Sequence, residues 1–246
     1  MSCGTKPLDR QLLDRFAASV RDVGPACDLG CGPGHVARYL HEHGVQVCGV
    51  DLSAELVERA HRLTPGIEFR QGDMMALDIP DGTWAGVAAF YSIIHIPRGD
   101  MARALSELRR VLRPGALLLL SFHIGDDTIH LDDWWDQKVC VDFFFFRSAE
   151  IAGYLTSAGF EIEEIIEREP YPDVEHIGRG DQLLNSRSII WSNCKPGQGE
   201  ELRGRRNGLC PVPILLKQVF DKSALVCRAE LPLLAIATLL AIPETR

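Results

Sequence analysis

Apolar and polar positions along the chain predict strands and helices in turn. Short apolar runs of strand character are separated by stretches in which apolar residues recur at helical spacing. The expected strands cover residues 26–29, 45–50, 67–70, 84–91, 116–122 and 160–167, and the expected helices cover 8–20, 35–43, 54–63, 100–112 and 148–158. This order predicts an α/β fold with a doubly wound, mostly parallel sheet that is covered by helices.

A glycine-rich turn follows the first expected strand. An apolar approach ends in Asp28, and glycines at alternate positions then lead into a helix expected from His35. Glycine permits backbone dihedrals closed to other residues and lets a ligand lie against the main chain, while the positive end of the following helix points at the same place. The pattern predicts a nucleotide-binding loop, whose glycines are Gly30, Gly32 and Gly34.

The residue at position 35 indicates which class of nucleotide the loop binds. The dinucleotide fingerprint G-x-G-x-x-G requires glycine there, and this chain has His35. A dinucleotide oxidoreductase is therefore the least favoured alternative. An acidic residue followed by x-G-x-G-x-G instead resembles motif I of the class I S-adenosylmethionine-dependent methyltransferases. The resemblance implies a Rossmann-like class I methyltransferase fold with S-adenosylmethionine as cofactor, contacted by Asp28, the three glycines and Cys31; a carboxylate suits its sulfonium cation.

The second expected strand adds an acidic residue at its end. Asp51 follows the apolar run 45–50 and lies 23 residues after Asp28, as expected of one strand–helix–strand step. The resemblance implies that Asp51 accepts hydrogen bonds from the ribose hydroxyls and that Leu52 also contacts the cofactor. The alternative is that Asp51 only caps the helix that starts near Ala54, a role that Ser53 would share.

A third acidic position follows the next strand. The sequence Gly72-Asp73-Met74 resembles the adenine-binding step of the same family. The resemblance implies that Asp73 accepts from the exocyclic amine and that the main-chain N–H of Met74 reaches a ring nitrogen. The alternative is a plain turn with an aspartate cap.

The resemblance covers residues 8–170 and is closest to the type 11 methyltransferase domain group. It implies transfer of a methyl group to a small-molecule acceptor by in-line displacement, over the carboxyl ends of the fourth and fifth strands. The protein then mainly holds donor and acceptor in contact, and a base matters only if the acceptor must lose a proton early. Candidate catalytic residues near these strand ends are Tyr91, His95 and His123, and Tyr91 is also a candidate contact to the cofactor. For His95 the alternative is a ring that bonds the backbone near its loop.

The stretch after the fifth strand carries acidic, histidine and aromatic residues. His123, Asp126, Asp127 and His130 could in principle bind a metal, but such a loop is more often a solvated lid, and we predict no metal site. The aromatic residues within 134–146 form either a hydrophobic lid over an apolar or aromatic acceptor or an inserted strand, 139–146, whose four phenylalanines pack on the core or on a partner subunit.

Composition and charge limit the partners. A net charge of −8 argues against general binding to nucleic acid phosphates. The 8 cysteines contain no C-x-x-C pair, which indicates reduced thiols and a cytoplasmic protein, and no leader pattern opens the chain. We expect a small-molecule partner, with neither nucleic acid nor membrane. A homo-oligomer is left open by the apolar run 231–242, which is either a docking helix, an oligomer contact or an aggregation-prone end.

The chain changes character near residue 170. Residues 1–170 carry a net charge of −10 and are expected to form the S-adenosylmethionine-binding domain, whereas 171–246 carry +2 and form an atypical segment. The family fold ends in an antiparallel strand, for which 187–192 is the first candidate and 224–229 the second. The apolar run 231–242 is too short to span a bilayer, which needs ~20 residues. Because the stretch before Asp28 is short for the family's roof, a non-catalytic cofactor-binding module is the alternative function.

Overall fold

The computed structural model describes residues 6–134, 137–171, 187–194 and 216–218. The strands of its main sheet are β1 (Ala26–Leu29), β2 (Val47–Asp51), β3 (Glu68–Gln71), β4 (Trp84–Phe90), β5 (Leu112–His123), β8 (Phe160–Arg168), β9 (Arg187–Cys194) and β10 (Leu216–Gln218). The helices are α1 (Pro7–Val20), α2 (His35–Glu42), α3 (Ala54–Leu63), α4 (Arg98–Val111) and α5 (Ser148–Ser157), with a 3-10 turn at Ile93–His95. The α/β alternation expected from the hydrophobic pattern is confirmed.

The sheet has the order β10-β8-β9-β5-β4-β1-β2-β3. The pairs β1–β2, β1–β4, β2–β3 and β4–β5 are parallel, whereas β9 lies antiparallel between β5 and β8. The antiparallel strand expected at 187–192 is therefore confirmed as β9. The second candidate, 224–229, and the apolar run 231–242 lie outside the described residues.

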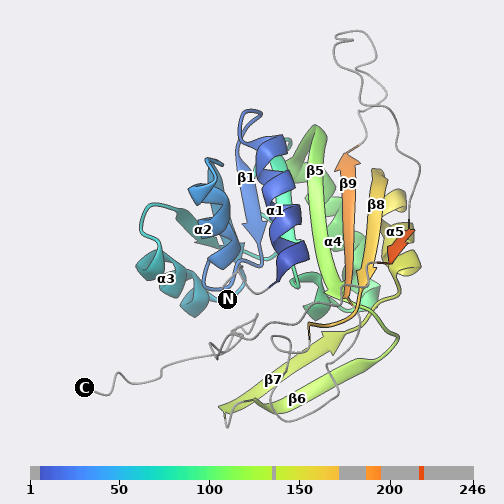
Figure 1. Ribbon diagram of the computed structural model, residues 1–246. Helices are drawn as coiled ribbons and strands as arrows, with labels where there is room; N and C mark the ends of the chain where they lie inside the picture. Colours follow the sequence, from blue (N-terminus) through green and yellow to red (C-terminus); the bar gives the residue numbers. More distant parts are fainter. Residues whose placement is uncertain (1–5, 135–136, 172–186, 195–215, 219–246) are drawn as a thin grey trace.

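Helices cover both faces of the sheet (Figure 1). One apolar cluster joins α1, α2 and α3 to the sheet through side chains such as Phe16, Leu40 and Val57. The other joins α4 and α5 to the opposite face through side chains such as Leu105 and Leu155. The middle of β5 has no polar residue between Ala116 and Leu120 because it is buried between the two layers.

Strands β6 (Thr128–Trp134) and β7 (Gln137–Phe144) form a separate antiparallel hairpin. It lies beyond the edge of the sheet toward which β1 points (Figure 1). An isolated bridge pairs Ile124, the residue after β5, with Phe146, and Phe143, Phe145 and Phe146 are buried in the core. The inserted-strand interpretation of this aromatic stretch is therefore confirmed for β7.

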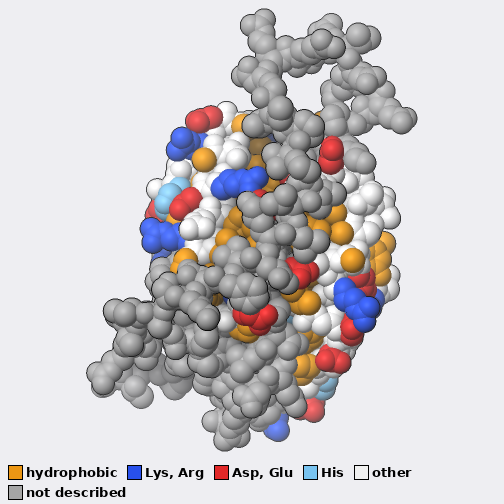
Figure 2. Space-filling model, turned by 45° about the vertical axis from the view of Figure 1, so that its right-hand side comes forward, with side chains coloured by type: hydrophobic (Ala, Val, Ile, Leu, Met, Phe, Trp, Pro, Cys, Tyr) orange, Lys and Arg blue, Asp and Glu red, His pale blue; other side chains and the backbone are white. Residues whose placement is uncertain are grey.

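The described surface is mixed in charge on the face seen in Figure 2. Lys and Arg side chains alternate there with Asp and Glu rather than gathering in a basic patch. None of the helices within the described ranges has the length and apolar character that a bilayer crossing requires.

Candidate functional site

The loop between β1 and α2 is tied to the end of β2 by main-chain hydrogen bonds. The N–H groups of Gly30 and Cys31 donate to the Val50 carbonyl at 2.7 and 3.1 Å. Gly34 then donates to the Cys31 carbonyl at 2.9 Å and begins α2 with φ of 81°. The three glycines all have positive φ, which side-chain-bearing residues rarely adopt. The sequence pattern therefore folds into the tight turn that it predicted.

Space beside this loop differs from glycine to glycine. A Cβ added at Gly30 would lie 2.3 Å from the Ser92 Cβ, and one at Gly34 would lie 2.6 Å from the Phe69 ring. Both positions therefore need glycine for packing. A Cβ at Gly32 would meet nothing within 4 Å, so this glycine leaves open space beside its main chain. That space is where a ligand can lie against the loop.

Asp28 lies beneath the loop rather than on its surface. Its side chain is 2% exposed, and its Oδ2 accepts from the Ala37 N–H at 2.8 Å, which satisfies a free donor in the first turn of α2. Burial raises the pKa of the carboxyl to about 7, the Ala37 hydrogen bond lowers it, and the nearby Asp51 charge raises it. A positive ligand near the loop would favour the ionised form.

Asp51 joins β2 to the glycine loop. Its Oδ2 accepts from the Gly32 N–H at 2.7 Å, and its Oδ1 accepts from the Ser53 N–H at 2.9 Å. Ser53, not Asp51, caps α3, because its Oγ accepts from the Leu56 N–H. A carboxylate can accept about four hydrogen bonds, so Asp51 keeps acceptor capacity for a ligand. Leu52 beside it is 65% exposed, and an apolar side chain of this size on the surface can pack against a flat ligand.

Asp73 forms a turn after β3. Its Oδ1 accepts from the Met75 N–H at 2.8 Å, and its carbonyl accepts from the Ala76 N–H at 2.9 Å. Met74 is partly buried against the core. The plain-turn interpretation is thus correct for the local geometry, and the second carboxylate oxygen of Asp73 provides the acceptor that an exocyclic amine would need.

Ser92 follows β4 and packs against the glycine loop. Its side chain is 6% exposed, and its Oγ has no hydrogen-bond partner within the described part of the chain. Leaving a buried hydroxyl unpaired costs about 1–3 kcal/mol. A ligand in the space beside the loop would supply the missing partner.

Tyr91, at the carboxyl end of β4, is held in an unusual backbone conformation. Its φ of 52° is the one positive value at a non-glycine residue within the described ranges. Its N–H donates to the Ser121 carbonyl at 3.0 Å and also lies 3.1 Å from the Ser121 Oγ. Strained backbone of this kind costs about 1–3 kcal/mol and is concentrated at functional sites. The neighbouring strand β5 therefore fixes where the Tyr91 ring lies.

The site residues near the acceptor edge divide into two groups. The His123 ring lies between those of Tyr91 and Phe145, with centroids 5.4 Å from each. His95 instead faces the hairpin, where its Nδ1 lies 2.9 Å from the Asp142 carbonyl and its ring meets Phe143 at 4.9 Å. The structure thus brings Tyr91 and His123 together, and His95 adopts the backbone-bonding arrangement named as its alternative.

Buried charged residues around Tyr91 were not expected from the sequence. Arg168 donates to the Tyr91 hydroxyl and to Asp9 Oδ1, both at 3.3 Å, and Lys6 Nζ lies 5.2 Å from the Tyr91 ring centroid. All three charged residues are under 9% exposed. They come from α1, its N-cap position and β8, so no local motif joins them. One signal was available: Arg168 ends a strand whose carboxyl end lies at the same sheet edge as that of β5.

The acidic and histidine residues from the end of β5 into β6 do not converge on one point. Asp126 binds Arg147 through both carboxylate oxygens, at 2.6 and 2.5 Å. His130 lies between Asp142 and Asp132, whose hydrogen bonds raise its pKa. Within the residues that the structure describes, no three His, Cys, Asp or Glu side chains come together in an arrangement that would hold a metal ion.

Comparison with known proteins gives this geometry a context. Residues 26–115 match the family model described as a methyltransferase domain. A malonyl-[acyl-carrier protein] O-methyltransferase of Enterobacter lignolyticus is 29% identical over 151 residues, which are 58% of this chain and 58% of that protein. A 2-methyl-6-phytyl-1,4-hydroquinone methyltransferase of Synechocystis is 35% identical over 117 residues, 46% of this chain and 36% of that protein. The chain thus spans less than two thirds of the length of these curated relatives.

A solved structure extends the likeness to the whole fold. The S-adenosylmethionine-dependent methyltransferase of Methanosarcina mazei superposes with a TM-score of 0.61 at 19% identity, and the alignment covers 70% of this chain and 92% of that one. At this level of identity the likeness establishes a shared fold. The mostly parallel sheet of this chain therefore has the same overall arrangement as that solved methyltransferase structure.

Proposed function

We propose that this chain, which belongs to the class I S-adenosylmethionine-dependent methyltransferases through residues 26–115, binds S-adenosylmethionine and transfers its methyl group to a small-molecule acceptor. The observation that carries the proposal is the open space beside Gly32, whose N–H is held by Asp51 at 2.7 Å. A glycine loop, a helix N-terminus and an acidic strand end meet at that space.

The residues present fit this cofactor. Asp51 would accept from the ribose hydroxyls with the acceptor capacity that Gly32 and Ser53 leave to it. Leu52 would pack against the nucleoside, Asp73 would accept from the adenine amine, and the buried Ser92 hydroxyl would gain a partner. S-adenosylmethionine supplies a methyl group on a positively charged sulfur, an electrophile that needs no metal or redox partner.

The acceptor would lie over the carboxyl ends of β4 and β5. Tyr91 and His123 face each other there and would position the acceptor against the methyl donor. The Tyr91 hydroxyl already accepts from Arg168, which favours an orienting role over that of a base. The buried aromatic rings of the hairpin stem exclude water and favour an apolar or aromatic acceptor.

Calorimetric titration with S-adenosylhomocysteine tests the proposal, with NADH as the control ligand. We expect S-adenosylhomocysteine to bind at micromolar concentration and NADH to give no heat. A folded chain that binds neither ligand contradicts the proposal. Normal binding of S-adenosylhomocysteine without methyl transfer to any acceptor class would favour the non-catalytic module.

A further inference from the structure

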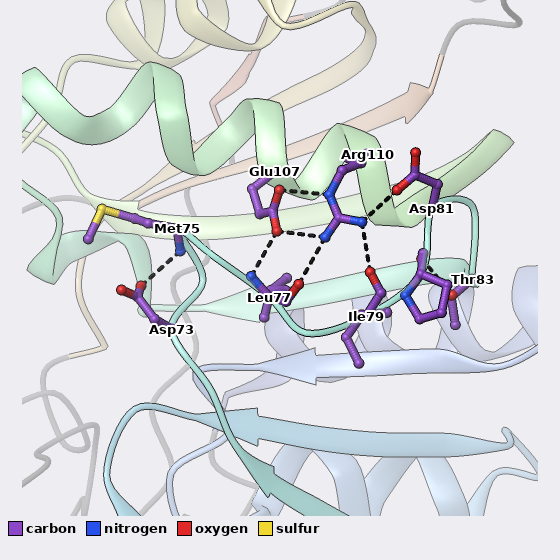
Figure 3. Close-up of polar contacts among 9 residues, drawn as sticks. Asp73, Met75, Leu77, Ile79, Asp81, Thr83, Glu107 and Arg110 are labelled. Carbon is purple, nitrogen blue, oxygen red and sulfur yellow. Dashed lines mark hydrogen bonds and ion pairs between the residues drawn. The ribbon is translucent and has the colours of Figure 1, made fainter.

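The middle of the segment between β3 and β4 is held against the carboxyl-terminal part of α4 (Figure 3). It runs from the Asp73 turn past Glu107 and Arg110 and enters β4 at Trp84. Arg110 of α4 donates to two carbonyls of this segment, that of Leu77 at 2.9 Å and that of Ile79 at 2.7 Å. It also donates to Asp81 Oδ1 at 2.6 Å. One guanidinium therefore holds three alternate residues of an irregular segment.

Glu107, one turn earlier on α4, completes this contact. Its two carboxylate oxygens accept from Arg110 Nε at 2.8 Å and Nη2 at 2.7 Å. The same Oε1 accepts from the Leu77 N–H at 2.7 Å. Leu77 is therefore held by α4 through both of its main-chain groups. The hydrogen bond from Arg110 also lowers the pKa of Glu107, so the carboxylate remains ionised near neutral pH.

The held segment is directly connected to the Asp73 turn. Only Ala76 lies between Met75, which closes that turn by donating to Asp73 Oδ1, and Leu77. The Ala76 N–H donates to the Asp73 carbonyl, so the link has little freedom of its own. The place of the Asp73 carboxylate relative to the glycine loop therefore depends on where α4 holds Leu77.

We propose that Arg110 and Glu107 are positioning residues for the nucleoside base, acting through Leu77 on the carboxylate of Asp73. The inference rests on the proposed function, because it takes the base to be the adenine of S-adenosylmethionine. A planar fork that donates in several fixed directions can hold carbonyls and a carboxylate at once, which a lysine ammonium cannot do with the same geometry. Arg110 and Glu107 thereby determine selectivity for adenine without contacting the base themselves.

Binding of two ligands that differ only in the base tests this inference. S-adenosylhomocysteine has an exocyclic amine that can donate to Asp73, and its purine analogue has a hydrogen atom in place of that amine with the ring nitrogens unchanged. We expect the natural chain to prefer the adenine ligand by about tenfold, the scale of one charge-assisted hydrogen bond. In Arg110→Ala most of this preference should be lost, and Arg110→Lys should retain part of it.

A double-mutant cycle shows whether the effect passes through Asp73. Asp73→Ala should abolish the preference, and adding Arg110→Ala to it should lower the preference no further. Arg62→Ala is the matched control, because it removes an exposed arginine and its ion pair with Glu58 from another helix. It should leave the preference unchanged.

The possible results separate the inference from the proposed function. A natural chain that binds neither ligand overturns both. A natural chain that binds both ligands equally, or an Arg110→Ala chain that unfolds cooperatively and keeps the full preference, overturns the inference alone. If Arg110→Ala does not fold, Arg110→Lys decides: a preference equal to that of the natural chain contradicts the positioning role, whereas a reduced one supports it.

Discussion

Asp51 illustrates how one residue serves both the fold and the proposed chemistry. Its carboxylate holds the Gly32 N–H and the Ser53 N–H, and so fixes the loop before any ligand arrives. A loop that is already in place loses less conformational entropy on binding. Asp51 is therefore expected to affect ligand binding directly and through the loop.

Replacing Asp51 by alanine tests this double role. Asp51→Ala removes the acceptor for ribose and the support of Gly32, so affinity for S-adenosylhomocysteine should fall by at least the roughly 1.5–3 kcal/mol of a charge-assisted hydrogen bond. Calorimetric titration measures the change. Unchanged affinity would contradict the ribose assignment.

Gly32 and Gly44 form a matched pair for testing the open space. Both have positive φ, at 51° and 81°, and a Cβ at either meets nothing within 4 Å. Gly32→Ala and Gly44→Ala should each cost about 1–2 kcal/mol of stability through the backbone alone. Only Gly32→Ala should also weaken the binding of S-adenosylhomocysteine, because Gly44 lies away from the site, in the turn after α2. An equal effect of both on affinity would show that the ligand does not contact Gly32.

Ser92 and Ser121 form a second matched pair. The Ser92 hydroxyl is buried without a partner in the described part of the chain, whereas the Ser121 Oγ lies 3.1 Å from the Tyr91 N–H. Ser92→Ala should leave the free energy of unfolding equal or higher and should lower the affinity for S-adenosylhomocysteine severalfold. Ser121→Ala should lower stability instead. Denaturant unfolding and titration separate the two, and unaltered affinity in Ser92→Ala would remove Ser92 from the site.

Asp28 should make stability depend on pH. Its pKa rises from the ordinary value of 3.8 to about 7 on folding, chiefly through burial. Between these values the folded chain keeps a proton that the unfolded chain releases, so raising the pH through this window lowers the free energy of unfolding. Asp28→Asn keeps an oxygen that can accept from Ala37 and removes the charge. The free energy of unfolding of this variant should fall less from pH 4 to 7 than that of the natural chain, as measured by urea unfolding at each pH. The same dependence on pH in both chains would contradict the raised pKa.

At the scale of elements, the hairpin of β6 and β7 is anchored by its stem. Phe145 is fully buried against His123, its carbonyl accepts from Arg98, and its N–H donates to the Asp127 main-chain carbonyl at 3.0 Å. Arg147 and Asp126 also join the two sides of the stem, but both side chains are exposed. Apolar burial should therefore hold the hairpin more strongly than this ion pair does.

Two substitutions compare these contributions. Phe145→Ala should lower the free energy of unfolding by about 3–5 kcal/mol, because it leaves a cavity in the core. Arg147→Ala should lower it much less. If urea unfolding gave equal losses for the two variants, the hairpin would not be anchored through its apolar stem.

At the scale of the whole molecule, β9 decides whether the sheet is complete. It pairs with β5 from Leu117 to His123 and with β8 from Phe160 to Arg168. Without β9 both neighbours would expose unpaired main-chain groups in the middle of the sheet.

Truncation on either side of β9 tests its importance. A chain ending at residue 186 should lose cooperative thermal unfolding, whereas one ending at residue 194 should retain it. Calorimetric melting distinguishes them. Cooperative unfolding of the shorter chain at the same temperature would mean that the sheet does not require β9.

The sequence predicted most of the fold because its hydrophobic pattern is strong. Buried parallel strands are continuous apolar runs, and the amphipathic helices between them repeat at helical spacing, so their expected positions differ from the observed ones by only a few residues. The glycine loop was also predictable, because its positive φ values restrict residue choice locally. Strand β6 was not predicted, since its alternation of polar and apolar residues is short and breaks at the consecutive aspartates Asp132 and Asp133.

What the sequence alone determined is the order of elements and the local chemistry of each strand end: the loop from Asp28 to Gly34, Asp51 and Asp73. What only the tertiary structure decided is which side chains meet. It paired Tyr91 with His123 rather than His95, brought Arg168 to Tyr91 across 77 residues, and placed Arg110 on the Asp73 segment. Local patterns record backbone preference and burial, whereas contacts between distant residues depend on the order in which strands join the sheet.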